Sequence, residues 1–308
     1  MSKNYRNSGF QRKTGKKALK SNESGSAQED GSKRAYGMRS HGATTRPCSP
    51  KDMTQKRSKR PGSGREGGSG WIWGAHACKA ALANPRRTIH EILLTESSAA
   101  RYKLPQSAPP PKIVLPQVLD KAIPREAVHQ GIAIKAAPLE WPNLEDIAED
   151  EDDGLILVLD QITDPHNVGA MLRLCSAFGV RALVMQTRKA PPLSGALAKV
   201  AVGCLESVPV CLETNIANTL QNLQRIGWMV TGLAGETELE LKDTISGGGR
   251  HVIVMGAEGP GLRERVRKTC DQLAKIPMMS EAVPGQAESL NVATAAAIAL
   301  YEARRDHN

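Results

Sequence analysis

Aromatic side chains are scarce in this chain: Phe, Trp and Tyr together make up only 3% of its 308 residues. Stacking of bases on aromatic rings is therefore not expected to dominate any contact with nucleic acid. Long apolar runs are also lacking, because none approaches the ~20 residues that a membrane-spanning helix needs. The N-terminus has no apolar centre of the kind found in secretory signals, so we expect a cytoplasmic protein. Its basic, serine-containing start leaves an organellar transit peptide open as an alternative.

Grouped metal ligands and catalytic triads are lacking too. The sequence contains no Cys-x-x-Cys, no His-Glu-x-x-His and no Ser-His-Asp order of the kind that hydrolases use. Without such groupings neither a metal site nor a disulfide framework is predicted, and the thiols are expected to be buried and reduced. The histidines are expected to form local hydrogen bonds rather than to act in catalysis. The six scattered cysteines are Cys48, Cys78, Cys175, Cys204, Cys211 and Cys270.

Positive charge is concentrated at the N-terminus. Residues 1–70 contain 17 Lys and Arg against 5 Asp and Glu, and they account for the whole net charge of +9. Their Ser, Gly, Lys and Arg residues show almost no apolar periodicity, which predicts a disordered tail. Such a tail is either a solubilising segment or a non-specific arm that binds RNA phosphates. The overall charge therefore does not describe the folded part of the chain.

A first ordered unit is predicted from Trp71 onwards. WIWGAHACKAALANP is typical of a short strand that enters a helix ending near Asn84. IHEILLT, KIVLP and GIAIKAAP favour strands and VLDKAI favours a helix, so residues 71–139 are predicted to form a small α/β domain. Residues 140–153 are acidic and weakly periodic, and we interpret them as a linker between two domains.

Regular alternation of strands and helices begins at Gly154. LILVLDQI, RALVMQ, VPVCLE, WMVTGLA, HVIVMGAE and LAKIPM are short apolar runs of strand length. NVGAMLRLCSAFGV is expected to be a helix that stops at Gly179, and SGALAKVAVGCLE, IANTLQNLQRIG and NVATAAAIALYEARR are expected to be further helices. Strands that are apolar on both faces and alternate with helices predict a parallel sheet covered on both sides. Residues 154–308 are therefore predicted to form an α/β domain.

Three segments of this second domain place polar residues or glycines just after an apolar strand, where parallel sheets bind ligands. The first, DQITDPHNVG, begins at Asp160 and enters a helix that carries Arg173. Asn167 and Arg173 could face one another only if the intervening turn folds back. The simpler interpretation is that Asp164 or Asn167 caps the helix and that Arg173 is a solvated surface cation.

The second segment is MGAEGPGL at residues 255–262, where three glycines surround Glu258 after a buried strand. Glycines let the backbone approach a ligand closely, although a tight turn would use them equally well. The segment does not read Gly-x-Gly-x-x-Gly and has no acidic residue about 20 positions later, which disfavours a dinucleotide-dependent oxidoreductase. It also lacks the Gly-Lys-Ser/Thr ending of a phosphate-binding P-loop.

The third segment, SLNV, stands at the head of the final helix. Ser289 is predicted to be the N-cap, so a plain helix start is the simpler interpretation. Alternatively, an exposed backbone N–H group and the Asn291 amide could hold a carboxylate or orient a hydroxyl. The residues alone thus indicate an α/β enzyme-like domain with a glycine-rich ligand loop.

Taken in this order, the three segments resemble the signature motifs of the SpoU (TrmH-like) branch of the SPOUT RNA methyltransferases. The matching text is DPHNVGAMLRLCSAFGV, VMGAEGPGLRERVRKTCDQLAKIPM and SLNVATAAAIALYE, within residues 154–305. The resemblance implies methyl transfer from S-adenosylmethionine to a ribose 2′-hydroxyl of RNA. It also implies a homodimer and a C-terminal trefoil knot, which no periodicity argument predicts because knots are rare.

The first domain also resembles part of a known family. WGAHACKAAL and HQGIAIKA are similar to the opening and closing segments of the L30e-like RNA-binding domain of methyltransferases that modify a guanosine of large-subunit (23S-type) rRNA. This similarity implies rRNA as the partner. Relatives with other RNA targets carry the same domain, so methylation of tRNA stays open. A non-catalytic RNA-binding factor of ribosome assembly is the alternative from a different functional class.

The resemblance assigns roles to residues by motif position. A ribose hydroxyl is a poor nucleophile, so the protein must align it with the methyl group and stabilise the developing alkoxide. The catalytic arginine of the family falls on Arg173, which we expect to act electrostatically because a guanidinium very rarely gives up a proton. The other residues so assigned are Asn167, Ser289 and Asn291 for catalysis, and Gly256, Glu258, Gly261, Ile276, Met278 and Leu290 for the cofactor.

Two departures from the family pattern concern the third motif. Ala293 stands where the motif normally ends in serine, which removes one hydroxyl but leaves Ser289 and Asn291. The loop MSEAVPGQAE at residues 279–288 is longer than usual and borders the expected cofactor pocket. It therefore puts contacts to the adenosine in question. Retention of the other polar motif residues speaks against the non-catalytic alternative.

Overall fold

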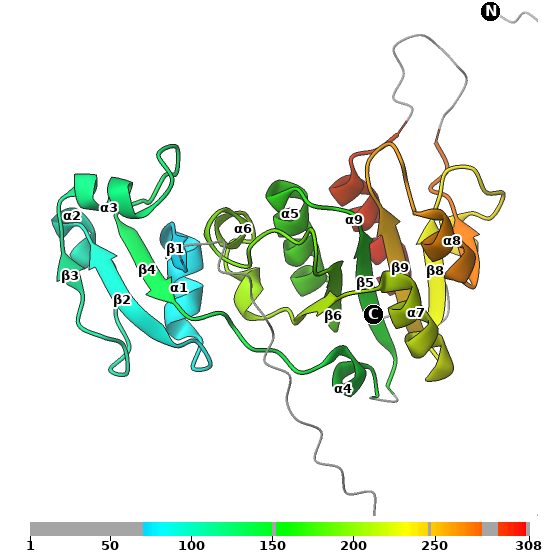
Figure 1. Cartoon of the computed structure of the whole chain (residues 1–308), viewed down its shortest axis with the longest axis horizontal. Helices are drawn as coiled ribbons and strands as arrows, with labels where there is room; N and C mark the ends of the chain where they lie inside the picture. The colour runs from blue at the N-terminus through cyan, green and yellow to red at the C-terminus, as the bar shows by residue number, and fades with distance from the viewer. Residues whose placement is uncertain (1–69, 150–151, 246–247, 279–288, 306–308) are drawn as a thin grey trace, which may run out of the picture. The chain divides into compact units, whose positions relative to one another are not determined.

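The computed structural model describes most of the chain from Gly70 onwards (Figure 1). The rest of the predicted tail, the long loop of the third motif and Cys48 lie outside the described residues. Within the described part, no helix is long and apolar enough to cross a membrane. The described ranges are 70–149, 152–245, 248–278 and 289–305.

The first part of the described chain forms a four-stranded mixed sheet in the order β1-β4-β2-β3. Strand β4 pairs antiparallel with β1 and β2, and the edge strand β3 runs parallel to β2. The strands and the two longer helices lie where the sequence predicts them, whereas α2 is not predicted by the sequence pattern. The elements are β1 (Trp71–Trp73), α1 (Ala75–Ala83), β2 (Ile89–Leu94), α2 (Glu96–Ala99), β3 (Lys112–Ile113), α3 (Pro116–Ala122) and β4 (Ile132–Ala136).

The second part forms a six-stranded sheet in the order β10-β8-β9-β5-β6-β7. All of its strand pairs are parallel, which confirms the predicted parallel sheet. The strands are β5 (Gly154–Asp160), β6 (Ala182–Gln186), β7 (Val210–Glu213), β8 (Met229–Leu233), β9 (Arg250–Gly256) and β10 (Gln272–Ala274). The helices are α4 (Leu144–Ala148), α5 (Pro165–Ala177), α6 (Gly195–Val200), α7 (Ile216–Arg225), α8 (Glu264–Thr269) and α9 (Val292–Arg304), with 3₁₀ turns η1 (Cys204–Glu206) and η2 (Leu241–Asp243).

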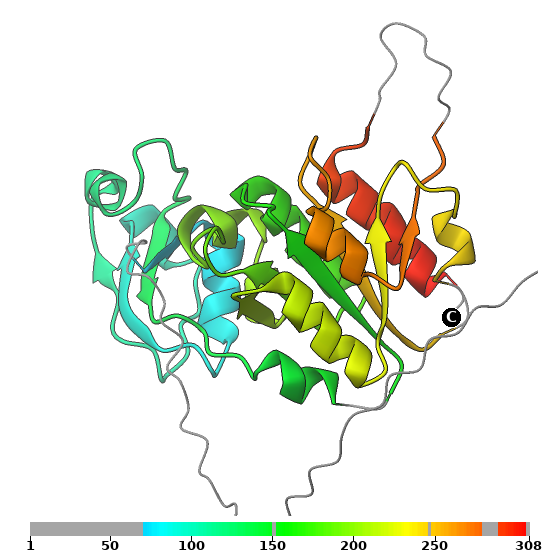
Figure 2. The ribbon, with the colours of Figure 1, turned by 45° about the vertical axis from the view of Figure 1, so that its right-hand side comes forward.

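Helices cover both faces of this sheet (Figure 2). Alternate residues of the central strand β5 belong to different core clusters: Leu155, Leu157 and Leu159 pack with residues of α5, α6 and α9. Ile156 and Val158 pack with residues of α4, α7 and α8 instead. Because successive side chains of a strand point to opposite faces, this division follows directly from the continuous apolar run of β5.

Two segments differ from what the sequence predicts. The predicted linker contains helix α4, whose Leu144 and Ala148 are buried against the sheet, and the indole nitrogen of Trp228 donates a hydrogen bond to the Ala148 carbonyl at 3.0 Å. The helix predicted from SGALAKVAVGCLE ends early, at Val200. Val202 and Gly203 have φ angles of 53° and 95°, and such left-handed backbone interrupts an α-helix before the turn η1.

Helix α5, which carries two of the predicted site residues, is held from both sides. A Cβ atom at Gly169 would lie 2.7 Å from the Val200 side chain, so the glycine permits the close approach of α5 and α6. At the other end, the Arg304 guanidinium on α9 donates hydrogen bonds to the carbonyls of Phe178 and Gly179, both at 3.0 Å. These contacts satisfy carbonyl groups that the end of α5 leaves unpaired.

The segment after α1 and the turn η1 are joined by an ion pair that is almost completely buried. Arg87, after α1, contacts Glu206 of η1 at 2.6 Å, with side-chain exposures of 2% and 8%. Asn84 also donates to the Glu206 carboxylate, at 2.8 Å, and Arg87 donates to the Ala137 carbonyl at 2.7 Å. These hydrogen bonds compensate the loss of hydration of both charges.

The thiols behave largely as predicted. Cys78, Cys175 and Cys211 are buried, and Cys204 and Cys270 are partly buried. Burial raises the pKa of Cys211 and Cys270 to about 12. The pKa values of Cys78 and Cys175 are raised further by the same cause. A thiol with a raised pKa is protonated at neutral pH and therefore a weak nucleophile, so these cysteines are structural.

Candidate functional site

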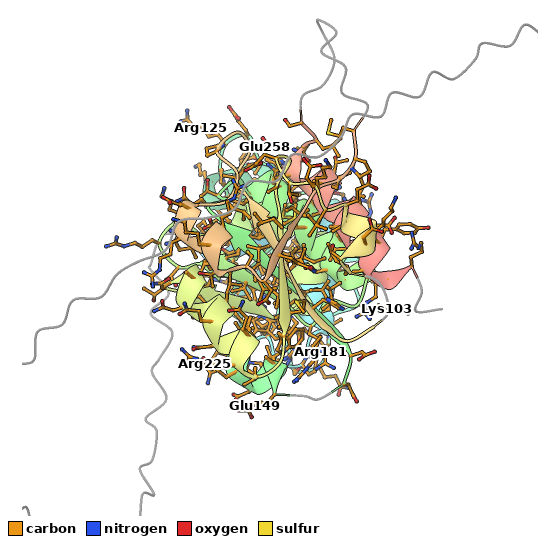
Figure 3. All side chains as sticks on the ribbon, turned by 90° about the vertical axis from the view of Figure 1, so that its right-hand side faces the viewer. Lys103, Arg125, Glu149, Arg181, Arg225 and Glu258 are labelled. Carbon is orange, nitrogen blue, oxygen red and sulfur yellow. The ribbon has the colours of Figure 1, made fainter. Side chains whose placement is uncertain are left out.

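The candidate site lies at the carboxyl ends of the two central strands. Strands β5 and β9 pair over their whole length, and the last residue of β5, Asp160, lies opposite Gly256 at the end of β9. The first two motif segments therefore begin side by side, as expected for a parallel sheet. Figure 3 shows Glu258 at the opposite end of the sheet from Glu149, Arg181 and Arg225.

The first segment enters α5 through a capped turn. The Asp164 carboxylate accepts hydrogen bonds from the backbone N–H groups of His166 and Asn167, both at 3.2 Å. The prediction that Asp164 or Asn167 caps this helix is therefore confirmed for Asp164. Pro165, at the first helical position, adds a φ angle that suits the helix start. The cap leaves the Asn167 side chain free to make other contacts.

The glycine-rich second segment folds into a tight turn after β9. Ala257 and Gly261 exchange two backbone hydrogen bonds, at 3.2 and 2.9 Å. A side chain at Gly256 would collide with the backbone of Gly261, so this glycine is required by the turn itself. Gly259 and Gly261 have φ angles of 81° and 66° and have open space where a side chain would stand. The turn therefore exposes its backbone on the outer side.

The third segment starts α9 two residues later than a serine cap at Ser289 requires. Helix α9 begins at Val292, and the Asn291 side chain accepts hydrogen bonds from the N–H groups of Ala293 and Thr294, at 3.0 and 3.3 Å. The prediction that Ser289 is the N-cap is thus wrong, because Ser289 lies two positions before the cap and is exposed. Asparagine and serine are about equally favourable caps, so the sequence did not distinguish them.

The Asn291 amide joins all three segments. Its nitrogen donates to the Glu258 carboxylate at 2.7 Å and to the Asn167 side-chain oxygen at 3.1 Å. The same Glu258 oxygen accepts from the backbone N–H of Val292 at 3.1 Å. The Val292 N–H and the Asn291 amide therefore hold a carboxylate of the protein itself, that of Glu258 in the second segment. A negative charge is favourable at this helix N-terminus.

A second link between β5 and the glycine-rich turn is not predicted from the sequence. Asp160 is completely buried, and its carboxylate accepts hydrogen bonds from the Arg263 backbone at 3.0 Å and from the Arg263 side-chain Nε at 2.8 Å. Arg263 is the residue just before α8, so the ion pair fixes the far end of the turn to β5. The sequence feature that could have pointed to this ion pair is a carboxylate at the end of an otherwise apolar strand. Gln161, next to it, has a positive φ of 63°.

Other predicted site residues are not joined to this network by hydrogen bonds. Arg173 is exposed on α5, and its side chain makes no hydrogen bond or ion pair with the residues that the structure describes. Because α5 is regular, Asn167 and Arg173 project roughly 120° apart around its axis, and the turn between them does not fold back. Ser289 is exposed, Leu290 and Ile276 are half-buried, and Met278 is 37% exposed.

The arrangement can bind a polar ligand and position it. Two amides, a carboxylate and an open glycine backbone converge at one edge of the sheet, with half-buried apolar side chains from the segments after β10 and before α9. In the described ranges, no group of three or more His, Cys, Asp or Glu side chains could hold a metal ion. The polar side chains gathered here can form hydrogen bonds and stabilise charge.

Two family models match the chain. The model of the SpoU rRNA Methylase family covers residues 154–301, which include the parallel sheet and all three motif segments. A model described as RNA 2′-O ribose methyltransferase substrate binding covers residues 71–142, which include the four-stranded sheet.

Curated proteins similar to this chain include two named 23S rRNA (guanosine-2′-O-)-methyltransferase RlmB. The protein from Vibrio vulnificus is 37% identical over 243 residues, which cover 76% of this chain and 96% of the relative. The protein from Escherichia coli K12 is 36% identical over 245 residues, which cover 77% of this chain and 98% of the relative. Both similarities therefore extend over nearly the full length of the relatives.

Solved structures of similar proteins share the fold. A putative RNA methyltransferase of the TrmH family from Porphyromonas gingivalis superimposes with a TM-score of 0.61 at 26% identity, covering 76% of this chain and 89% of its own. The SpoU methyltransferase AviRb from Streptomyces viridochromogenes in complex with the cofactor AdoMet gives a TM-score of 0.61 at 20% identity, covering 77% and 89%. The second likeness shows the α/β fold alone.

We predict that the Asp160–Arg263 ion pair is a strong determinant of stability. Arg263→Ala leaves the Asp160 carboxylate buried without a charged partner, which is expected to lower the free energy of unfolding by about 3–5 kcal/mol. Urea denaturation followed by circular dichroism measures this loss. Arg265→Ala is the matched control, because the Arg265 side chain is exposed and donates to the Asn218 side chain rather than to a buried carboxylate. Equal losses in the two variants would contradict the assigned role.

Proposed function

Because the chain belongs to the SpoU rRNA methylase family, we propose that it transfers a methyl group from S-adenosylmethionine to the ribose 2′-hydroxyl of a guanosine in 23S rRNA. The observation that carries this proposal is the junction of the three motif segments through Asn291 at the carboxyl ends of β5 and β9. Support for the substrate comes from relatives named for this reaction, which match three quarters of the chain.

The proposed organisation follows the sequence prediction. Residues 1–70 form a basic tail, 71–139 an L30e-like RNA-binding domain, 140–153 a linker that includes α4, and 154–308 the methyltransferase domain. The match of the substrate-binding family model to residues 71–142 supports the second of these. We further propose a C-terminal trefoil knot and a homodimer, both of which rest on the family resemblance, and a cytoplasmic site of action, as expected for an enzyme whose substrate is rRNA.

The residues at the site fit the proposed cofactor. Gly259 and Gly261 leave open space beside an exposed backbone, which suits a ligand held by main-chain hydrogen bonds. Ile276 and Leu290 offer half-buried apolar surface for an adenine ring, and Met278 lies two residues beyond Ile276. When bound, S-adenosylmethionine supplies a methyl group activated by its sulfonium. Gly256 and Glu258 shape the pocket indirectly, by forming the turn and by fixing it to α9.

The polar side chains have two proposed tasks in the reaction. The Asn167 and Asn291 amides, already oriented by their mutual hydrogen bond, position the ribose hydroxyl together with Ser289. The Arg173 guanidinium is exposed and forms no ion pair within the described ranges, so its charge is available to stabilise the alkoxide as it develops. Because Arg173 keeps its own proton, the hydroxyl proton leaves to a substrate phosphate or to water.

The proposed function is tested with purified protein, radiolabelled S-adenosylmethionine, and large-subunit rRNA or bulk tRNA lacking the modification. We expect label in 2′-O-methylguanosine from rRNA, and its loss in Arg173→Ala because the alkoxide loses its stabilising charge. Label only in tRNA would keep the chemistry and overturn the substrate. No label in either RNA, together with no cofactor binding, would favour the non-catalytic RNA-binding alternative.

The role of Arg173 is tested further by the pH dependence of the rate. Arg173→Lys keeps a positive charge but not the planar guanidinium, so partial activity with an unchanged pH profile is expected. Full activity with a new basic limb in the profile would show that residue 173 acts as a general base, against the electrostatic assignment.

Glu258 is expected to act through Asn291. Glu258→Ala removes one of the two acceptors of the Asn291 amide nitrogen, and a misplaced amide is expected to lower kcat by about 100-fold. Glu258→Gln keeps an oxygen acceptor and is expected to retain more activity. Glu264→Ala serves as the control, since Glu264 is exposed and its side chain forms an ion pair with Lys268, remote from the Asn291 network. If the Gln and Ala variants lose the same activity, the charge rather than the hydrogen bond is what matters.

A further inference from the structure

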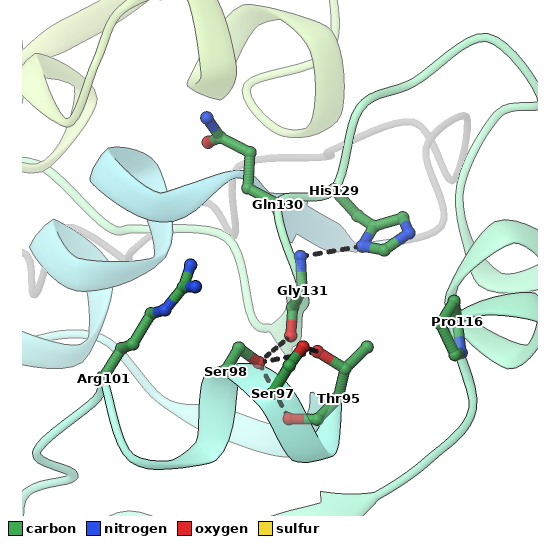
Figure 4. A pocket seen from close by; sticks show the side chains of 8 residues that line it. All are labelled: Thr95, Ser97, Ser98, Arg101, Pro116, His129, Gln130 and Gly131. Carbon is green, nitrogen blue, oxygen red and sulfur yellow. Dashed lines mark hydrogen bonds between the residues drawn. The ribbon is translucent and has the colours of Figure 1, made fainter.

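A polar cavity with a volume of about 430 Å³ lies outside the candidate site, in the part of the chain built on the four-stranded sheet. It is formed where α2 follows β2 and where the chain enters β4 (Figure 4). None of its lining residues belongs to the three motif segments. The lining contains hydroxyls, an imidazole, an amide and a guanidinium, and no carboxylate. The residues are Thr95, Ser97, Ser98, Arg101, Pro116, His129, Gln130 and Gly131.

One side of the cavity is rigid. Thr95 and Ser98 are only 5% and 2% exposed, and their hydroxyls are hydrogen-bonded to each other at 3.0 Å. The Ser98 hydroxyl also contacts the Gly131 carbonyl at 2.6 Å. A Cβ atom at position 131 would lie 2.8 Å from both Thr95 and Ser98, so the hollow depends on a glycine there. These groups are oriented before any ligand arrives.

The other side is held in an unusual backbone conformation. Gln130 has a φ angle of 56°, which non-glycine residues seldom adopt and which is often found at ligand sites. Its side-chain oxygen accepts a hydrogen bond from the Ala75 N–H at 2.8 Å, which fixes the residue to the start of α1. The His129 ring is fixed by the Gly131 N–H, which donates to Nδ1 at 2.9 Å, and its Nε2 lies 3.4 Å from Asp120. Figure 4 shows Arg101 and His129 on opposite sides of Gly131.

The chemistry of the lining restricts the ligand. The Arg101 side chain is exposed and makes no hydrogen bond or ion pair with the described part of the chain, so its guanidinium is available to an anion. A cation would find no carboxylate in the lining. A protein partner would need an apolar anchor point, and Pro116 is the only apolar side chain there. The cavity volume is in the range of small-ligand sites, which suits a single nucleotide.

We propose that this cavity binds one unpaired nucleotide of the RNA substrate. Proteins recognise RNA mainly at single-stranded positions, where a splayed base stacks on an aromatic, histidine or arginine plane and the 2′-hydroxyl forms hydrogen bonds. His129 and Arg101 provide such planes in a chain that has few aromatic residues, and the exposed Ser97 hydroxyl can form a hydrogen bond with a ribose, while the buried Thr95 and Ser98 hydroxyls hold the wall of the cavity in place. The inference rests on the proposed function and identifies the residues by which the first domain holds the substrate.

The test compares cavity variants with matched controls of the same charge change. Arg101→Ala removes a charge from the cavity, and Lys103→Ala removes one from an exposed residue outside it. Ser97→Glu places a negative charge in the cavity, and Ser107→Glu places one on an exposed residue elsewhere in the domain. Fluorescence anisotropy measures binding to unmodified 23S rRNA transcribed in vitro, and steady-state assays give KM for RNA and kcat.

We expect both cavity variants to weaken RNA binding and to raise KM for RNA by about 10-fold, in line with the loss of one base contact. The two controls should change either value less than 2-fold, and kcat and the affinity for S-adenosylhomocysteine should stay unchanged in all four variants. Effects of equal size in cavity and control variants would overturn the proposal, because they would show only a general electrostatic attraction.

Photo-crosslinking of wild-type protein gives an independent measurement. RNA containing 4-thiouridine should crosslink to peptides that include residues 95–101 or 129–131, as identified by mass spectrometry. Crosslinks confined to other segments would overturn the cavity assignment. If the same preparation still methylated rRNA, the proposed function would be upheld. Absence of both rRNA binding and methylation in the wild-type protein would instead reject the proposed function itself.

Discussion

The Asn291 side chain is the contact on which the geometry of the candidate site depends. Through its oxygen it starts α9, and through its nitrogen it binds Asn167 and Glu258. Those partners follow β5 and β9, so one amide sets the relative positions of three segments that are far apart in the sequence. Each half of the amide is satisfied by groups of the required type, since the oxygen accepts and the nitrogen donates. The site is therefore fixed by hydrogen bonds between its own residues.

The parallel sheet prepares this junction. Because β5 and β9 are paired neighbours, their carboxyl ends present the first two segments side by side, and the ion pair of the buried Asp160 with Arg263 fixes the turn between β9 and α8. Helix α9 packs against α5 and completes the site. Its Arg304 side chain also donates to the carbonyls of Phe178 and Gly179, just after the end of α5. The part of the chain built on the other sheet contributes a separate polar cavity, so substrate binding and methyl transfer are assigned to different regions.

The features that were predicted from the sequence are those that depend on a local pattern of residues. Apolar runs such as that of β5 indicated a parallel sheet, and Asp164 was recognisable as a helix cap. Pairings over long sequence separations, such as Asp160 with Arg263, leave no local pattern and were missed. Helix boundaries were uncertain by one or two residues, which placed the α9 cap on Ser289 instead of Asn291. The roles of Arg173 and the cofactor residues came from the family resemblance, since spacing alone favoured a solvated cation.

The dual bonding of Asn291 also makes the protein sensitive to a slow chemical change. Spontaneous deamidation turns an asparagine into an aspartate of nearly the same shape, which could still cap α9 through one oxygen. The other oxygen, however, would face the Glu258 carboxylate where an amide nitrogen now donates at 2.7 Å. Two negative charges at that distance repel, so the glycine-rich turn would be pushed away from α9. A change of charge on a single side chain would thus weaken the link between α9 and the glycine-rich turn.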